Sequence, residues 1–140
     1  MSYLLDTNVI SELVRPQPDA NVLSWFKDVP DRALHLSVLS LGEIRKGVEG
    51  MASGSRREKL RLWLEQDLPA WFEDRLLPVS LQVADRWGRM LAEAGRPLPA
   101  VDSLLAATAL SHELRLVTRN VEDFRIAGLD VINPWQAAAK

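Results

Sequence analysis

Short apolar segments alternate with amphipathic segments along the chain, and this alternation restricts the possible folds more than any other feature of the sequence. The apolar segments are SYLLD (2–6), ALHLS (33–37), RLLPV (75–79), LRLVTRN (114–120) and LDVINP (129–134). Short runs of this kind, bounded by polar residues or prolines, predict buried strands. Strands that alternate with helices pair in parallel, so we expect an α/β fold with a mostly parallel central sheet of four to five strands, flanked by helices.

The segments between the strands repeat apolar residues at three- and four-residue intervals, which is the pattern of helices that pack on one face. Asp19 and Ser80 are favoured capping residues at two of the helix starts, and Gly50 and Gly95 mark two of the ends. The predicted helices are 7–15, 19–29, 37–50, 55–73, 81–95 and 101–114, followed by a short helical piece over 121–128. The helix over 101–114 is apolar nearly all round, so we expect it to be buried.

Length and composition exclude several classes of protein. The 140 residues suit one domain, which we take as 1–140. The absence of cysteine excludes disulfides and thiolate metal sites. No apolar stretch approaches the roughly 20 residues of a membrane-spanning helix, and Asp6 comes too early for a secretory signal. We therefore expect a cytoplasmic protein without a membrane contact.

The net charge of −2 excludes a globally basic nucleic-acid-binding surface, so any contact with nucleic acid must be local. The densest basic stretch is SRREKLRLW (55–63), for which a solvated helix face is the simpler interpretation. Other basic side chains that can hold phosphates are Arg15, Arg45, Lys46 and Arg119. For each of these four, surface solubility is the alternative role.

Acidic and amide side chains lie near the ends of several predicted strands. Asp6 comes directly after the first strand, and Asn120 and Asp123 follow the strand LRLVT. Asp102 lies in the first turn of the buried helix, and Glu43 lies one to two turns into the helix after the second strand. Ligands of open parallel sheets bind beyond the carboxyl ends of the strands, so we expect these residues to converge there.

A gathering of carboxylates predicts a cation. Carboxylates at one point repel one another and cannot all ionise unless a positive charge neutralises them. Because the chain has no cysteines and no clustered histidines, the fitting ligand is a hard divalent ion held by oxygen atoms. We expect Mg²⁺, or Mn²⁺, rather than zinc.

Each acid also has a purely structural interpretation. Asp6 can cap the helix that follows it, and Asp102 can serve only the dipole of its own helix. Glu43 points away from the apolar stripe of its helix, as a solvated glutamate does, and Asp123 can be an ordinary helix-start residue.

Small residues accompany two of these acids. On a helical wheel Asp102 aligns with Ala106 and Ala109, which we expect to leave space beside the carboxylate. Glu43 lies beside Ser40 and Gly47, on a helix face that can also line a groove.

Three segments carry a family likeness. LLDTNVISEL at the start, LSVLSLGEIRKGVE in the middle and VDSLLAATALSHELRLVTRNVEDF near the end closely resemble a PIN domain of the VapC/FitB toxin group, the nuclease halves of toxin–antitoxin pairs. The resemblance implies an endoribonuclease that depends on Mg²⁺ or Mn²⁺ and leaves a 3′-hydroxyl and a 5′-phosphate. The catalytic positions that it implies are Asp6, Glu43, Asp102, Asn120 and Asp123, with Asp6, Asp102 and Glu43 as metal ligands.

The resemblance also implies supporting residues and partners. Thr7, Asn8 and Thr118 match the polar residues that orient the acids, with ordinary turn and cap hydrogen bonding as their alternative role. Asn120 stands where some relatives have Asp, which leaves the fourth active-site group open between Asn120 and Asp123. The partners implied are an RNA substrate, a cognate antitoxin and a second copy in a homodimer, with operator DNA bound by the toxin–antitoxin complex.

Two other functions compete with the nuclease. One is a non-catalytic PIN-like module that acts as a protein partner or DNA-associated regulator, and the presence of all three principal acids disfavours it. The other is a phosphatase-like or response-regulator-like protein in which Asp6 is a nucleophile or phosphoacceptor. The absence of a second aspartate two residues after Asp6 disfavours the phosphatase. The sequence also lacks a P-loop, a Rossmann fingerprint and a Gly-x-Ser-x-Gly elbow.

Overall fold

The computed structural model describes residues 1–136, and residues 137–140 of the predicted domain lie outside this described part. Its centre is a sheet of five parallel strands in the order β3-β2-β1-β4-β5. The strands are β1 Tyr3–Leu5, β2 Leu34–Ser37, β3 Leu76–Leu77, β4 Arg115–Val117 and β5 Val131–Ile132. The prediction of an α/β fold with a mostly parallel central sheet of four to five strands is confirmed.

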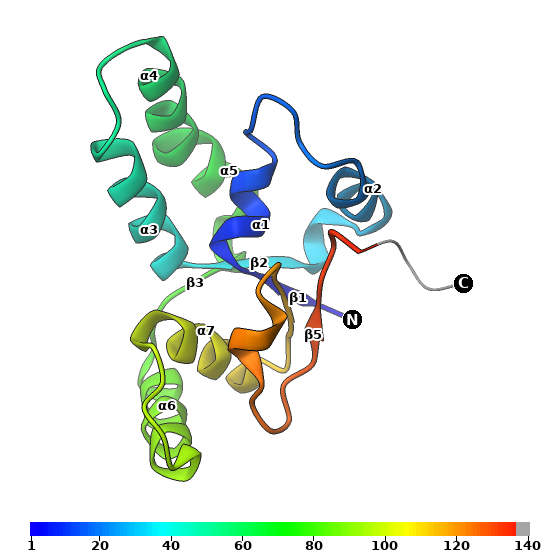
Figure 1. Ribbon diagram of the computed structural model, residues 1–140, viewed down its shortest axis with the longest axis vertical. Helices are drawn as coiled ribbons and strands as arrows, with labels where there is room; N and C mark the ends of the chain where they lie inside the picture. The colour runs from blue at the N-terminus through cyan, green and yellow to red at the C-terminus, as the bar shows by residue number, and fades with distance from the viewer. Residues whose placement is uncertain (137–140) are drawn as a thin grey trace.

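Helices cover both faces of the sheet. The α-helices are α1 Thr7–Glu12, α2 Ala20–Asp28, α3 Val38–Glu49, α4 Ser55–Leu62, α5 Leu68–Phe72, α6 Leu81–Ala94 and α7 Ala100–Ser111. Short 3-10 turns are η1 Asp31–Ala33, η3 Glu73–Arg75 and η4 Val121–Phe124, and η2 Trp63–Asp67 is a π turn. Figure 1 shows α1 to α5 on one side of the sheet and α6 with α7 on the other. None of the helices in residues 1–136 is long and apolar enough to cross a membrane.

The alternation of side chains along each strand produces two cores. Leu4 and Leu116 pack on the face covered by α6 and α7, whereas Leu5 and Val117 pack on the opposite face. All four side chains have no exposed surface. Because successive strand residues point to opposite faces, a strand buried on both sides must be apolar at every position. This is why the strands are continuous apolar runs in the sequence.

The strand order places the first and fourth strands side by side at the centre of the sheet. The chain runs from β1 outward through β2 to β3, then returns to pair β4 with the other side of β1. The two chain directions therefore diverge at the carboxyl ends of β1 and β4. Such a switch point leaves a crevice beyond the strand ends, and the residues that follow β1 and β4 enter it.

The predicted helix over 55–73 is wrong as a single helix. It is divided into α4, the π turn and α5, and in the π turn the Leu68 N–H donates to the Trp63 carbonyl five residues earlier. Pro69 lies at the start of α5 and has no N–H for the regular hydrogen-bond pattern. The hydrogen-bond register therefore changes just before the proline.

Other predicted elements are shorter in the structure. The helix predicted over 7–15 ends at Glu12, before Arg15 and Pro16, since the residue before a proline disfavours the helical conformation. The strand predicted over 75–79 keeps only Leu76–Leu77, because Pro78 cannot donate to a strand partner. The helices predicted over 101–114 and 121–128 are reduced to Ala100–Ser111 and Val121–Phe124. The caps Asp19 and Ser80 are confirmed by their hydrogen bonds to the first helical turns.

Candidate active site

Asp6 lies at the switch point, between the end of β1 and the start of α1. Its backbone N–H donates to the Val117 carbonyl at 2.9 Å, which extends the pairing of β1 with β4 by one residue. Its carboxylate accepts hydrogen bonds from the Thr7 N–H at 2.7 Å and from Thr118 Oγ1 at 2.8 Å. Asn8 Nδ2 lies at 3.4 Å from Oδ2. Asp6 is only 7% exposed. Polar groups at the ends of both central strands take the place of water around its carboxylate.

The pKa of Asp6 is shifted by its burial and by the groups around it. Burial is the largest effect and raises the pKa, because the charged form is poorly solvated. The hydrogen bonds from Thr118 and Thr7 oppose this rise, and the negative charges of Asp102 and Glu43 add to it. The carboxylates of Asp6, Glu43 and Asp102 thus lie close enough for their charges to interact, although each belongs to a different segment of the chain.

Asp102 joins the same group from α7. It lies in the first turn of that helix and is partly buried. Burial raises its pKa most, followed by the negative charges of Asp123 and Glu43. The structure therefore brings Asp6, Glu43, Asp102 and Asp123 into one acidic region, although 117 positions separate the first from the last (123 − 6).

Glu43 is positioned by the first turn of α1. Thr7 Oγ1 donates to Glu43 Oε1 at 2.6 Å and also contacts Ser40 Oγ at 2.9 Å. Ser40 is fully buried, whereas the Glu43 side chain is exposed. A glutamate on the exposed face of α3 is thus bound to the residue next to Asp6.

The turn after β4 holds the remaining predicted residues. Thr118 is fully buried and accepts a hydrogen bond from the Asn120 N–H at 3.0 Å. The Asn120 carbonyl in turn accepts from the Asp123 N–H at 3.0 Å, which starts η4. Asn8 accepts from the Arg119 N–H at 3.4 Å. The Asn120 and Asp123 side chains are exposed at the rim of the acidic region.

The structural roles weighed for these acids are partly present. Asp6 does cap α1, through the hydrogen bond from the Thr7 N–H. A single cap needs one oxygen, and the second oxygen of Asp6 accepts from Thr118 across the sheet instead. Capping therefore accounts for only half of the contacts that this carboxylate makes.

The prediction that Ala106 and Ala109 leave an open space beside Asp102 is wrong. Ala106 and Ala109 have no exposed surface and belong to the core under α6 and α7. Small side chains on that face let α7 pack closely against its neighbours. The carboxylate of Asp102 instead lies at the helix start, where the chain leaves the core.

The donor set suits a hard divalent ion. Within residues 1–136 none of the four clustered carboxylates forms an ion pair with a lysine, arginine or histidine. Buried or partly buried carboxylates without a positive neighbour favour a bound cation with oxygen ligands. In the same part of the chain no three Asp, Glu or His side chains close tightly around one point. Ligation would therefore require rotation of the exposed Glu43 or the partly exposed Asp102 side chain, and these ligand assignments stay predictions.

One contact of the site was missed by the sequence reasoning. Ser40 contacts Thr7 and supports the link between α1 and α3, and its position three residues before Glu43 on the same helix face is the signal. The groove considered for the helix face of Glu43 and Gly47 is present, with a volume of about 320 Å³, between α1, α3 and α4. Thr7 and Glu43 line its acidic end, and Ile44, Leu60 and Trp63 line its apolar part.

Comparisons with known proteins identify the family of the chain. The PIN domain family matches residues 3–129. VapC ribonuclease Y4jK of Sinorhizobium fredii is 37% identical over 138 residues, which cover 96% of this chain and 99% of that protein. The toxin FitB of Neisseria gonorrhoeae is 37% identical over 135 residues, covering 94% and 97%.

Solved structures are similar over the same extent. The FitAcB structure from Neisseria gonorrhoeae contains a chain with a TM-score of 0.87 and 36% identity, covering 96% of this chain and 99% of that one. A chain in the structure of FitAB bound to an IR36 DNA fragment has a TM-score of 0.88 and 34% identity, covering 98% of both. The chain therefore belongs to the PIN-domain family, in the group that contains FitB and VapC ribonuclease Y4jK.

Proposed function

We propose that this protein is the toxin of a toxin–antitoxin pair and acts as an endoribonuclease dependent on Mg²⁺ or Mn²⁺. The observation that carries the proposal is the position of Asp6 at the switch point of a parallel sheet, with Glu43 and Asp102 close enough for their charges to act on it. Within residues 1–136 none of these three acids forms an ion pair. Relatives at 37% identity named as a VapC ribonuclease and a toxin support it. Because its substrate is cellular RNA, we place its activity in the cytoplasm.

Asp6, Asp102 and Glu43 hold the divalent ion in this proposal. When bound, such an ion supplies Lewis acidity toward a phosphate and lowers the pKa of water. Thr118 keeps one Asp6 oxygen in place from the neighbouring strand end, and Thr7 does the same for Glu43 from α1. The outer partners of metal ligands fix ligand orientation in this way.

The exposed rim residues act on water and RNA. Asn120 and Asp123 lie at the solvent side of the acidic region, where an amide or carboxylate can accept a hydrogen bond from an attacking water molecule. The negative charge of the region also repels RNA, and a bound cation weakens this repulsion. Cation binding and substrate binding are therefore coupled.

The test of this function is cleavage by the purified chain. Wild-type protein is expected to cleave RNA with Mg²⁺ or Mn²⁺, to stop in EDTA, and to leave products with a 5′-phosphate. Asp6→Asn and Asp102→Asn are expected to abolish cleavage with the fold retained, as judged by circular dichroism. Asp28→Asn, an exposed substitution at the end of α2, is the matched control. Unchanged cleavage by both site variants would remove the proposed mechanism, and folded wild type without metal-dependent cleavage would favour the non-catalytic module.

A second component of the proposal is the partner. The similar structures include toxin–antitoxin complexes, and the FitAB structure contains DNA. By analogy, this chain binds an antitoxin as a homodimer, and the complex binds operator DNA. The apolar groove ends at Thr7 and Glu43, so it fits an antitoxin segment with apolar side chains followed by a basic one.

Gly47 allows the groove to be blocked without disturbing the fold. It lines the groove, and a Cβ atom added there meets nothing within 4 Å. Gly47→Leu is expected to keep RNA cleavage and to lose inhibition by the co-expressed cognate antitoxin. Gly88→Leu in α6 is the control, because a Cβ atom added there also meets nothing within 4 Å. Equal inhibition of both variants would exclude the groove as the antitoxin site.

A further inference from the structure

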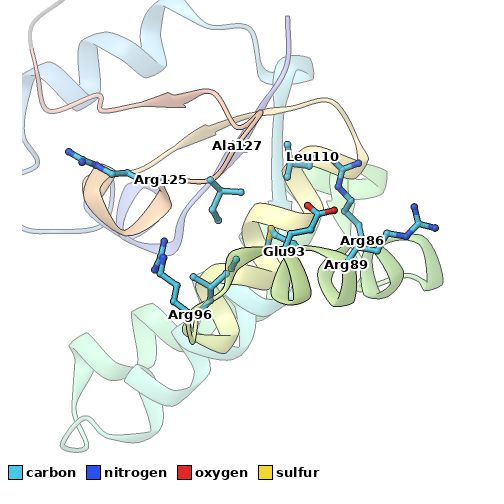
Figure 2. Close-up of a pocket in the computed structure, with 11 residues that line it drawn as sticks. Arg86, Arg89, Glu93, Arg96, Leu110, Arg125 and Ala127 are labelled. Carbon is cyan, nitrogen blue, oxygen red and sulfur yellow. The ribbon is translucent and has the colours of Figure 1, made fainter.

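A basic pocket lies on the α6 side of the sheet and outside the acidic region. It has a volume of about 370 Å³ and is formed by α6, the loop after it, the end of α7 and the segment after η4. Four arginines line it, Arg86, Arg89, Arg96 and Arg125, together with a single acid, Glu93. Figure 2 shows Arg96 and Arg125 toward one end of the pocket and Arg86 and Arg89 toward the other.

The arginines give this pocket an excess of positive charge. Arg89 pairs with Asp85 at 3.1 Å and Arg125 pairs with Glu122 at 2.6 Å. The four side chains of these two ion pairs are each more than 60% exposed. Exposed ion pairs of this kind contribute only about 0–1 kcal/mol and open readily. In residues 1–136 Arg86 and Arg96 take part in no ion pair. At least two guanidinium groups are thus available to an anion.

The inner wall of the pocket is apolar and belongs to the core. Met90 is 7% exposed, and Leu98, Leu110 and Ile126 pack against the same core. The volume lies in the usual range of about 300–1,000 Å³ for ligand pockets. A wall of this kind suits the sugar and one face of a base, while the arginines at the rim suit phosphate groups.

The pocket adjoins the acidic region through two segments of chain. Arg125 follows Asp123 by two residues, so their Cα atoms are at most about 7.6 Å apart. Leu98 lies two residues before Ala100, where α7 begins, and Asp102 is in the first turn of that helix. A nucleic-acid strand that crosses the acidic region can therefore continue into the pocket at its Arg96 and Arg125 end.

Three of the other basic side chains form ion pairs with glutamates. Arg45 and Arg61 bind Glu65, Arg57 binds Glu49, and these residues form an ion-pair network over α3, α4 and the π turn. The solvated helix face is therefore the supported interpretation of the basic stretch 55–63. The sequence signal of the pocket is instead the spacing of residues 86, 89, 93 and 96, which follows one face of α6 and continues past its end.

We propose that the pocket lined by Arg86, Arg89, Arg96 and Arg125 binds the phosphate backbone of the RNA strand next to the bond that is cleaved. This proposal rests on the proposed nuclease function, because it identifies how the substrate of that site is held. The acidic region repels the strand, and the adjacent arginines supply the opposing attraction. Since phosphate contacts carry no sequence information, this pocket positions RNA without selecting its sequence.

The experiment measures binding of a labelled single-stranded RNA in EDTA at several salt concentrations. Arg86→Gln and Arg96→Gln are each expected to weaken binding and to lower the slope of log K against log salt by about 0.7, the loss of one single-strand phosphate contact. The double variant is expected to lose about 1.4. Arg32→Gln is the control, because Arg32 is exposed, lies in η1 directly before β2 and does not line the pocket.

Further readouts separate this role from a structural one. Arg96→Lys is expected to retain most of the salt slope, since a lysine still contacts phosphate as a point charge. In cleavage assays, Arg86→Gln and Arg96→Gln are expected to raise KM and to leave kcat unchanged. The losses should be equal for RNAs of different sequence.

Several results would overturn the proposal. Binding by the pocket variants equal to that of Arg32→Gln excludes the pocket as an RNA site even if metal-dependent cleavage is observed. A changed oligomeric state with unchanged RNA binding makes the pocket a contact between copies of the chain. Displacement of RNA by a stoichiometric nucleoside monophosphate makes it a nucleotide site. Pocket-dependent RNA binding without cleavage by wild type would instead retain the pocket and remove the nuclease.

Discussion

Replacement of Thr118 by valine tests how the second central strand end supports the acid on the first. Thr118 is fully buried, and its hydroxyl donates to Asp6 at 2.8 Å and accepts from the Asn120 N–H at 3.0 Å. Valine has nearly the same shape but no hydroxyl. Thr118→Val therefore removes one donor from a buried carboxylate and one acceptor from the turn that leads to η4, with little change in packing.

The expected magnitude follows from the charge on Asp6. A hydrogen bond to a charged group contributes about 1.5–3 kcal/mol, and 1.4 kcal/mol corresponds to a factor of ten. A loss of roughly 10- to 150-fold in metal affinity is therefore expected. Substitutions of residues that orient metal ligands commonly cost about 10–100-fold, which is the same range.

The sign of the pH effect is also determined. The hydrogen bond from Thr118 lowers the pKa of Asp6, against the rise caused by burial. Without this bond the pKa rises further, so Asp6 takes up a proton at a higher pH. The acidic limb of the RNA-cleavage profile should therefore move to higher pH in Thr118→Val.

The assay is a titration of RNA cleavage with Mn²⁺ and with Mg²⁺ across the acidic pH range, together with calorimetric measurement of Mn²⁺ binding. Thr118→Ser keeps the hydroxyl and loses only a methyl group, so it should retain metal affinity and the wild-type pH profile. Thermal unfolding controls for loss of the fold. If folded Thr118→Val bound Mn²⁺ within twofold of wild type and kept the same pH profile, the positioning role of Thr118 would be refuted.

Two further predictions concern stability. Burial and the charges of Asp123 and Glu43 raise the pKa of Asp102 above 3.8 in the folded chain. The contribution of Asp102 to stability is therefore full below pH 3.8 and is lost as the pH rises through the folded pKa. In urea unfolding with EDTA, the free energy of unfolding should decline less with rising pH for Asp102→Asn than for wild type, and parallel curves would contradict this. Glu12 is 4% exposed and accepts from the Asp19 N–H at 2.8 Å, so Glu12→Ala should lower the free energy of unfolding by about 1.5–3 kcal/mol, whereas a loss below about 0.5 kcal/mol would show that water replaces the carboxylate.

The position of Asp6 was predictable because it depends on local signals. The apolar run before it and the helix pattern after it mark a strand end, and parallel strands end at one edge of a sheet. Thr118 and Asn120 were placed by the same reasoning. The sequence could not show that β1 and β4 are neighbours, and only that pairing allows the hydrogen bond between Thr118 and Asp6.

Glu43 shows the limit of pattern-based prediction. Its exposed position on α3 is the same as that of a solvated glutamate, and periodicity has no signal that distinguishes the two. The packing of α1 against α3 brings Thr7 to within 2.6 Å of its carboxylate. The wrong expectation for Ala106 and Ala109 has a related cause, since small side chains on a helix permit either an open space or close packing, and the neighbouring elements decide between them.

The sequence by itself determined the order of strands and helices, most of the caps and the ends of the strands, because these depend on residues that lie within a few positions of one another. The tertiary structure decided which carboxylates share a region, which arginines are neutralised by glutamates and which remain around the basic pocket. Charges and hydrogen bonds act through space, and residues far apart in the chain become neighbours only through the strand order and the packing of helices on the sheet.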